Sequence, residues 1–183
     1  MRYFLLIAYI CLATFAQKIE SVGQIFPTSA ISKSDTSAII TGAAQTNAYL
    51  PLIKGKSVAL VVNQTSTIGN THLVDTLISK GVNIKTIFAP EHGFRGDHSA
   101  GASVTSGIDK KTGIKITSLY GKNKKPAATD LAGIVYVIFD IQDVGVRFYT
   151  YISTMHYVME ACAENNIPLI ILDRPNPNGH YVD

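Results

Sequence analysis

Short apolar runs, each bounded by turn residues, recur along the chain from about residue 50 onward. Runs of this length that are rich in Val and Ile are typical of strands buried on both faces of a sheet. The most regular run is IVYVIF, which contains no charged residue. The pattern therefore predicts strands over residues 57–62, 82–88, 115–119, 134–139 and 168–172.

Segments with apolar residues at helical spacing separate several of these strands. Residues 71–80 have this spacing, and Gly81 follows as a natural helix end. Residues 151–164 show the same pattern, and Pro126 suits the first position of a brief helix over 126–131. Alternating strands and helices predict an α/β fold. We expect a Rossmann-like three-layer domain with a mainly parallel sheet and helices on both faces.

The first 48 residues lack this alternation. Arg2 followed by the uncharged apolar stretch 3–13 is typical of a secretory signal peptide, which we place at residues 1–16. The stretch is short for a membrane-spanning helix, and an uncleaved anchor is the alternative. Residues 17–48 are rich in small and polar residues and are predicted to be a poorly ordered leader, which leaves 49–183 as the folded domain. Because of this signal-peptide pattern, we expect the protein to be secreted or periplasmic.

Composition narrows the class of protein. The chain has 183 residues, of which 46% are hydrophobic and 16% charged, enough for a single domain with an apolar core. The net charge of +3 is spread along the chain, so no nucleic-acid partner is predicted. Only Cys162 would remain after signal cleavage, so no internal disulfide can form. Glycine-rich nucleotide-binding motifs are absent from the sequence, and no cofactor is predicted.

One loop, FAPEHGFRGDH at residues 88–98, concentrates ionisable groups directly after a predicted strand. Its Pro and Gly residues prevent a long regular element, and loops on a rigid scaffold often carry chemistry. Apolar Phe88 and Phe94 near Glu91 would favour a protonated carboxyl group, as a general acid requires. An ion pair between Glu91 and Arg95 is the structural alternative. The ionisable residues of the loop are Glu91, His92, Arg95, Asp97 and His98.

Metal binding is a second function that this loop could have. His92, Asp97 and His98 could supply ligands, but they do not have the H-E-x-x-H spacing of a zinc hydrolase. We therefore predict no metal, and keep a metal-dependent hydrolase of another class as an alternative function.

Polar side chains also follow the other predicted strands. Ligands of open parallel sheets bind outside the carboxyl ends of the strands, so these residues should share one crevice. Asp140 is the best candidate for a second carboxylate, and its structural alternative is to cap the next turn. Arg147, followed by Phe148 and Tyr149, suits a ring-shaped ligand that carries a carboxylate. The remaining residues predicted to reach this crevice are Asn63, Gln64, Gln142, Asp143, Asp173, Arg174, Asn176 and Asn178.

Four long stretches in a fixed order resemble a known bacterial family, the exo-β-N-acetylmuramidases, formerly catalogued as a domain of unknown function. The stretches are VVNQT (61–65), FAPEHGFRGDHSAG (88–101), FDIQDVGVRFYTYISTM (139–155) and ILDRPNPNGHYVD (171–183). The resemblance covers about residues 49–183 and only the N-terminal portion of the family's length. It implies a Rossmann-like catalytic domain that is incomplete at its C-terminus, with the family's second domain absent.

The resemblance implies a glycosidase that removes terminal β-linked N-acetylmuramic acid from the non-reducing end of peptidoglycan fragments. It places the catalytic glutamate at Glu91, and glycoside hydrolysis needs such an acid and a second stabilising group. Asp140 would be that second group or would orient the substrate's acetamido group. Arg147 or Arg95 would bind the lactyl carboxylate. The predicted substrate-binding residues are Asn63, His92, Arg95, Gln142, Arg147, Tyr149 and Arg174.

The predicted partner is thus a muropeptide or another peptidoglycan fragment, with no nucleic acid and, after signal cleavage, no membrane. The alternative within the same family is a sugar-binding or degenerate fragment without turnover, because half of the family's fold is missing from the match.

Overall fold

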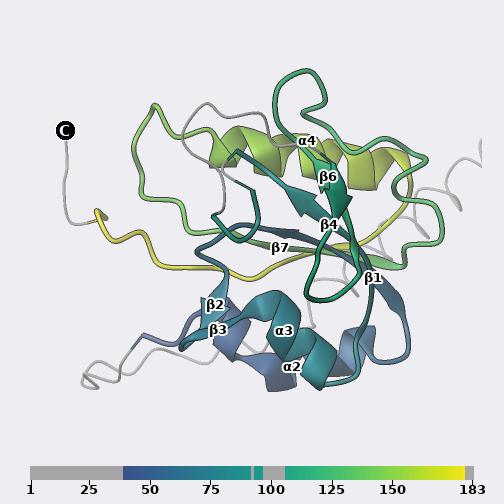
Figure 1. The fold of residues 1–183 in the computed structure, drawn as a ribbon. Helices are drawn as coiled ribbons and strands as arrows, with labels where there is room; N and C mark the ends of the chain where they lie inside the picture. Colours follow the sequence, from purple (N-terminus) through teal and green to yellow (C-terminus); the bar gives the residue numbers. More distant parts are fainter. Residues whose placement is uncertain (1–38, 92, 97–105, 180–183) are drawn as a thin grey trace, which may run out of the picture. The chain divides into compact units, whose positions relative to one another are not determined.

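The computed structural model describes residues 39–91, 93–96 and 106–179, and its centre is a six-stranded sheet in the order β5-β6-β4-β1-β7-β8 (Figure 1). All pairs are parallel except β5 with β6. In chain order the five parallel strands lie 3-2-1-4-5, which is the Rossmann arrangement. The strands of this sheet are β1 (Ser57–Val62), β4 (Asn83–Ala89), β5 (Gly107–Ile108), β6 (Lys115–Ser118), β7 (Tyr136–Asp140) and β8 (Leu169–Ile171).

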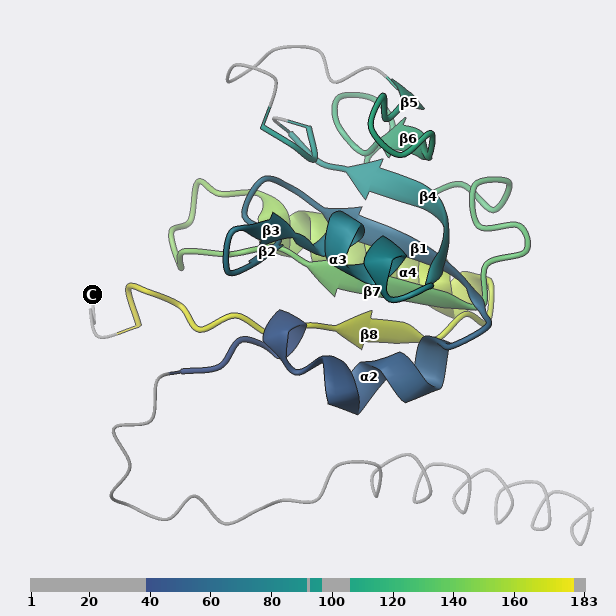
Figure 2. The ribbon, with the colours of Figure 1, turned by 60° about the horizontal axis from the view of Figure 1, so that its bottom comes forward.

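Helices cover both faces of the sheet, which confirms the predicted three-layer fold. Alternate side chains of β1 point into two separate cores, because successive residues of a strand face opposite sides. Val58 and Leu60 join α2 and α3, whereas Ala59 and Val61 join α4. Figure 2 shows α2 and α3 in front of the sheet and α4 behind it. The helices are η1 (Gly42–Ala44), α2 (Thr46–Ile53), α3 (Leu73–Ser79) and α4 (Tyr151–Glu164).

The folded unit begins at Ile39, earlier than the predicted boundary at residue 49. Gly42 donates its backbone N–H to the carbonyl of Asp173 at 2.7 Å, and a side chain at Gly42 would collide with the Asp173 backbone. The hydroxyl of Tyr49 donates to the Ala43 carbonyl at 2.8 Å. Residues 39–48 therefore belong to the domain and not to the leader, because contacts distant in sequence hold them. The rest of the predicted leader and the predicted signal peptide lie outside the described residues.

Two predicted helices differ from the structure. The helix expected over 71–80 starts only at Leu73, because Thr71–His72 forms β3, paired with β2 (Thr67–Ile68). Residues 126–131 form turns and no helix: the N–H of Leu131 is shared between two successive carbonyls, and Gly133 soon reverses the chain with a positive φ of 73°. Among the residues that the structure describes, no helix is long and apolar enough to span a membrane.

Candidate functional site

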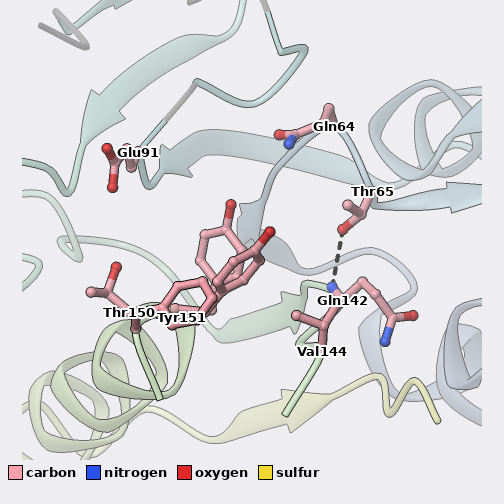
Figure 3. A pocket seen from close by; sticks show the side chains of 9 residues that line it. Gln64, Thr65, Glu91, Gln142, Val144, Thr150 and Tyr151 are labelled. Carbon is pink, nitrogen blue, oxygen red and sulfur yellow. Dashed lines mark hydrogen bonds between the residues drawn. The ribbon is translucent and has the colours of Figure 1, made fainter. Parts of the chain in front are cut away.

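A pocket of about 350 Å³ lies where the segments after β1, β4 and β7 meet the start of α4. These are carboxyl ends of neighbouring parallel strands, where the strand order of the sheet reverses, and this is the usual ligand position in such folds. Figure 3 shows Glu91 on one side of the pocket and Thr65 and Gln142 on the other. The pocket is lined by Gln64, Thr65, Glu91, Gln142, Val144, Phe148, Tyr149, Thr150 and Tyr151.

Glu91 reaches the pocket from the end of β4. Pro90 follows the strand directly, and its carbonyl accepts the Gly93 N–H at 3.2 Å in a tight turn. The negative charge of Glu91 and a hydrogen bond to it raise the pKa of the Tyr120 phenol. Burial raises the pKa of Tyr151, and the charge of Glu91 adds to that rise. Two phenols in their protonated form therefore lie near this carboxylate.

The loop after β1 is fixed by its own side chains. Oδ1 of the fully buried Asn63 accepts the backbone N–H of Thr65 at 2.9 Å and its hydroxyl at 2.6 Å. The same Thr65 hydroxyl accepts the backbone N–H of Gln142 at 3.0 Å, the bond drawn in Figure 3. Asn63, predicted to contact the substrate, does not line this pocket, and it holds Thr65, which links the loops after β1 and β7.

Asp140 is the last residue of β7 and is fully buried. Its Oδ1 accepts from Nε of Arg174 at 2.6 Å and its Oδ2 from Nη2 at 3.0 Å, and Nη2 also donates to the Thr67 carbonyl at 2.9 Å. Burial raises the pKa of Asp140, and Arg174 opposes the rise. The carbonyl of Asp140 accepts the Ser66 hydroxyl. The structure therefore brings Asp140 and Arg174 to each other, and neither lines this pocket.

Arg95 is also held by carboxylates. It donates to Asp75 through two bonds of 3.2 Å and to Asp109 through bonds of 3.2 Å and 3.0 Å, and its guanidinium lies 4.6 Å from the Phe94 ring centroid. Burial of Asp109 favours a raised pKa, but the bonds from Arg95 and Thr112 outweigh it and lower the pKa to about 2. Arg95 thus fixes the loop that carries Glu91, and it does not line the pocket.

His72 connects the same loop to β1, and the sequence analysis missed it. Its Nε2 lies 3.0 Å from the Asn63 carbonyl and 3.1 Å from the Phe94 carbonyl, while its Nδ1 accepts the Val74 N–H at 3.2 Å. These partners require a neutral ring with the proton on Nε2. Burial is the main cause of its lowered pKa. A single His before an apolar helix carries no sequence signal for this role beyond that of a helix cap.

The loop after β7 supplies the aromatic side of the pocket. The Tyr149 ring contacts Tyr151 edge-to-face with centroids 5.9 Å apart, and it contacts Phe148 at 5.6 Å. Arg147, beside them in the sequence, is exposed to solvent. The Gln142 amide donates to the Pro175 carbonyl at 3.0 Å, so the turn after β8 supports this loop.

At Gly145 the loop after β7 lies close to the turn after β8. It has a φ of 71°, and a Cβ there would lie 2.3 Å from the Asn176 amide nitrogen. Asn178 donates to the Val144 carbonyl at 2.8 Å. The DRPNPNG turn therefore braces the pocket wall from behind.

The predicted metal-ligand candidates His92, Asp97 and His98 lie outside the described residues. Within the described ranges, no group of three or more His, Cys, Asp or Glu side chains could hold a metal ion.

The topology and the pocket define an α/β protein of Rossmann type with a glutamate-bearing pocket at the strand ends. Residues 58–183 match the family model described as the N-terminal part of the exo-β-N-acetylmuramidase NamZ. The chain belongs to this family, which confirms the resemblance found in the sequence.

One curated protein and two crystal structures are similar to this chain. The chain is 50% identical to the peptidoglycan β-N-acetylmuramidase NamZ of Bacillus subtilis (strain 168) over 135 residues, which are 72% of this chain and 32% of that protein. Two crystal structures of DUF1343 family proteins from Bacteroides fragilis NCTC 9343 match with a TM-score of 0.69 each. The first is 48% identical, with 80% of this chain and 38% of that one covered, and the second is 41% identical, with 78% and 36% covered. The chain spans about a third of the length of these relatives.

Proposed function

We propose that this chain carries the Glu91-bearing part of a glycoside hydrolase that removes terminal β-linked N-acetylmuramic acid from the non-reducing end of peptidoglycan fragments. The observation that carries the proposal is the position of Glu91 in a pocket otherwise lined by amides, hydroxyls, aromatic rings and one valine. Such groups hydrogen-bond sugar hydroxyls and pack on the apolar face of a sugar ring. The name of the Bacillus subtilis relative supports the substrate class.

Glu91 would act as the general acid that protonates the departing glycosidic oxygen. The reaction needs this proton because an alkoxide is a poor leaving group, and a second group must stabilise the oxocarbenium-like centre. Tyr151 lines the same pocket and is a protonated phenol at neutral pH, so it can donate a hydrogen bond to the bound sugar.

Arg147 would bind the lactyl carboxylate of muramic acid. Of the two arginines considered for this role, Arg95 already donates to Asp75 and Asp109. Arg147 is exposed and precedes Phe148 and Tyr149, which line the pocket. A guanidinium matches the two oxygens of a carboxylate, which N-acetylglucosamine lacks.

We propose that Asp140 and Arg174 hold the segments around the pocket in position and do not contact the substrate. Both carboxylate oxygens of Asp140 accept bonds from Arg174, and Arg174 also holds the Thr67 carbonyl. The pair therefore fixes the end of β7, the segment after β8 and the start of β2 relative to one another, which would set the shape of the pocket.

A substrate in the cell wall would be met outside the cytoplasm. We propose that residues 1–16 act as a secretory signal and that the protein is secreted or periplasmic. N-terminal sequencing of the exported protein tests this, since a mature chain that starts at Gln17 is expected, and retention of Met1 would contradict it.

The test of the activity is the release of N-acetylmuramic acid from a β-linked disaccharide, whose leaving group is a sugar hydroxyl, by the wild-type chain, by Glu91→Gln and by Glu160→Gln. Glu160 is the matched control, because it lies on α4 outside the pocket with an exposed side chain paired to Lys125. We expect Glu91→Gln to lower kcat by about 100-fold or more, as loss of a general acid does, and Glu160→Gln to leave it unchanged. Full activity of Glu91→Gln would contradict the proposal, and loss of wild-type activity with a chelator would favour a metal-dependent hydrolase.

A further inference from the structure

Tyr120 lies beside Glu91, although it comes from a stretch that contains none of the family motifs. The register of β4 with β6 pairs Ala89 with Ser118, and the Leu119 N–H donates to the Ala89 carbonyl at 2.8 Å. Glu91 and Tyr120 each follow their paired residue by two positions. Since the strands are parallel, both residues leave the sheet at the same edge, next to each other.

Tyr120 is held at its backbone, its ring and its hydroxyl group. Its backbone N–H donates to the Ser118 hydroxyl at 3.2 Å, and its ring packs against the core on the α2 and α3 face of the sheet. Its hydroxyl is hydrogen-bonded to the Glu91 side chain. A ring fixed by packing on one side can only point its hydroxyl in a narrow range of directions, so the bond restricts the carboxyl group of Glu91.

We propose that Tyr120 is a positioning residue that orients the Glu91 carboxyl group for proton donation. The inference rests on the function proposed above. The phenol O–H donates to one oxygen of the carboxyl group, and the other oxygen is then left to carry the proton that goes to the glycosidic oxygen. Without this bond the carboxyl group can rotate about its last torsion angle, which has a broad, nearly two-fold preference.

The charge of Glu91 keeps Tyr120 suited to this task. A neighbouring negative charge and a hydrogen bond to it disfavour the phenolate, and both raise the pKa of Tyr120. The phenol therefore remains a donor throughout the pH range in which a carboxyl group could exchange its proton.

The first experiment tests the contact without any activity. Carbon-13 labelling of the tyrosine rings allows the ionisation of Tyr120 to be followed by NMR in the wild-type chain and in Glu91→Gln, with Tyr120→Phe used to assign the signal. We expect Tyr120 to ionise at lower pH in Glu91→Gln, because the negative charge has been removed. An unchanged titration would overturn the proposal.

The second experiment tests the consequence for hydrolysis, with Tyr136→Phe as the matched control. Tyr136 is also partly buried, and it lies at the start of β7, at the other end of the sheet. We expect Tyr120→Phe to lower kcat about 10-fold, as loss of one hydrogen bond to a charged group would, with KM within about twofold of wild type. The alkaline limb of the kcat/KM profile should move to higher pH, because a carboxylate that loses a donor holds its proton more readily.

An unchanged kcat and pH profile in Tyr120→Phe would overturn the positioning role. A wild-type chain without hydrolase activity, whose Tyr120 signal still responds to Glu91→Gln, would instead remove the proposed function and support the pairing of the two side chains.

Discussion

The loops after β4 and β7 contain the same kinds of charged residue and use them in opposite ways. In the loop after β4, the carboxylate of Glu91 lines the pocket, while Arg95 is tied to Asp75 and Asp109. In this loop the carboxylate faces the pocket, and the guanidinium is held in place by ion pairs.

At the end of β7, the carboxylate of Asp140 is fully buried and bonded to Arg174, while Arg147 in the loop that follows is exposed. Here the carboxylate is anchored and the cation is available. Residue type and position after a strand therefore do not decide whether a charged side chain serves the ligand or the fold. The decision depends on which opposite charge the rest of the chain brings within reach.

The largest expected effect concerns the anchored carboxylate. Asp140→Ala would leave Arg174, whose side chain is only 8% exposed, without its partner, and we expect a loss of about 3–5 kcal/mol in the free energy of unfolding. Asp130→Ala is the control, because its partner Lys115 is 57% exposed and such surface pairs contribute about 1 kcal/mol or less. Urea denaturation measures both, and equal losses would show that Asp140 is not an anchor.

The second effect concerns the anchored arginine and pH. The pKa of Asp109 is lowered from 3.8 to about 2, so its ionised form contributes stability that is present above pH 4 and lost as the pH falls toward 2. Asp109→Asn should therefore cost roughly 2 kcal/mol at pH 7 and make unfolding less sensitive to acid in that window.

Thermal unfolding of Asp109→Asn and wild type between pH 2 and 7 measures this difference, with Asp130→Asn as the control. Parallel pH dependences for wild type and Asp109→Asn would mean that Arg95 does not depend on this carboxylate.

The smallest effect on stability belongs to the exposed cation. Arg147→Ala should change the free energy of unfolding by no more than about 0.5 kcal/mol, because the side chain is exposed. Binding measured by calorimetry should fall about 10-fold or more for N-acetylmuramic acid and little for N-acetylglucosamine, which has no carboxylate. Arg147→Lys keeps the charge and should bind muramic acid better than Arg147→Ala does. Equal weakening of both sugars by Arg147→Ala would remove Arg147 from this role.

The elements of the fold were accessible from the sequence wherever the pattern was long and local. The strand over residues 57–62 and the helix over 151–164 have the predicted limits, and the mainly parallel sheet with helices on both faces is confirmed. The fold class follows from periodicity, because buried strands and amphipathic helices need apolar residues at fixed spacings. The prediction of a helix over 126–131 was wrong, because a proline at a suitable position does not supply the packing that a short helix requires.

The candidate site was accessible in part. The rule that polar residues after parallel strands share one crevice brought together Gln64, Glu91 and Gln142, which all line the pocket. It could not separate them from Asn63, which holds Thr65 and does not line the pocket. The sequence analysis also missed Tyr120, which directly follows the predicted strand over 115–119 but belongs to none of the four family motifs. The roles of these residues in catalysis stay predictions.

By itself, the sequence determined the alternation of elements, the family and the loop that carries Glu91, because these are written in spacings and in unbroken motifs. The tertiary structure alone decided which charges are anchored: Arg95 meets a carboxylate fourteen positions away and Asp140 an arginine thirty-four positions away. An ion pair forms between groups that the fold brings within a few ångströms and removes from water, and neither condition is visible in a local pattern.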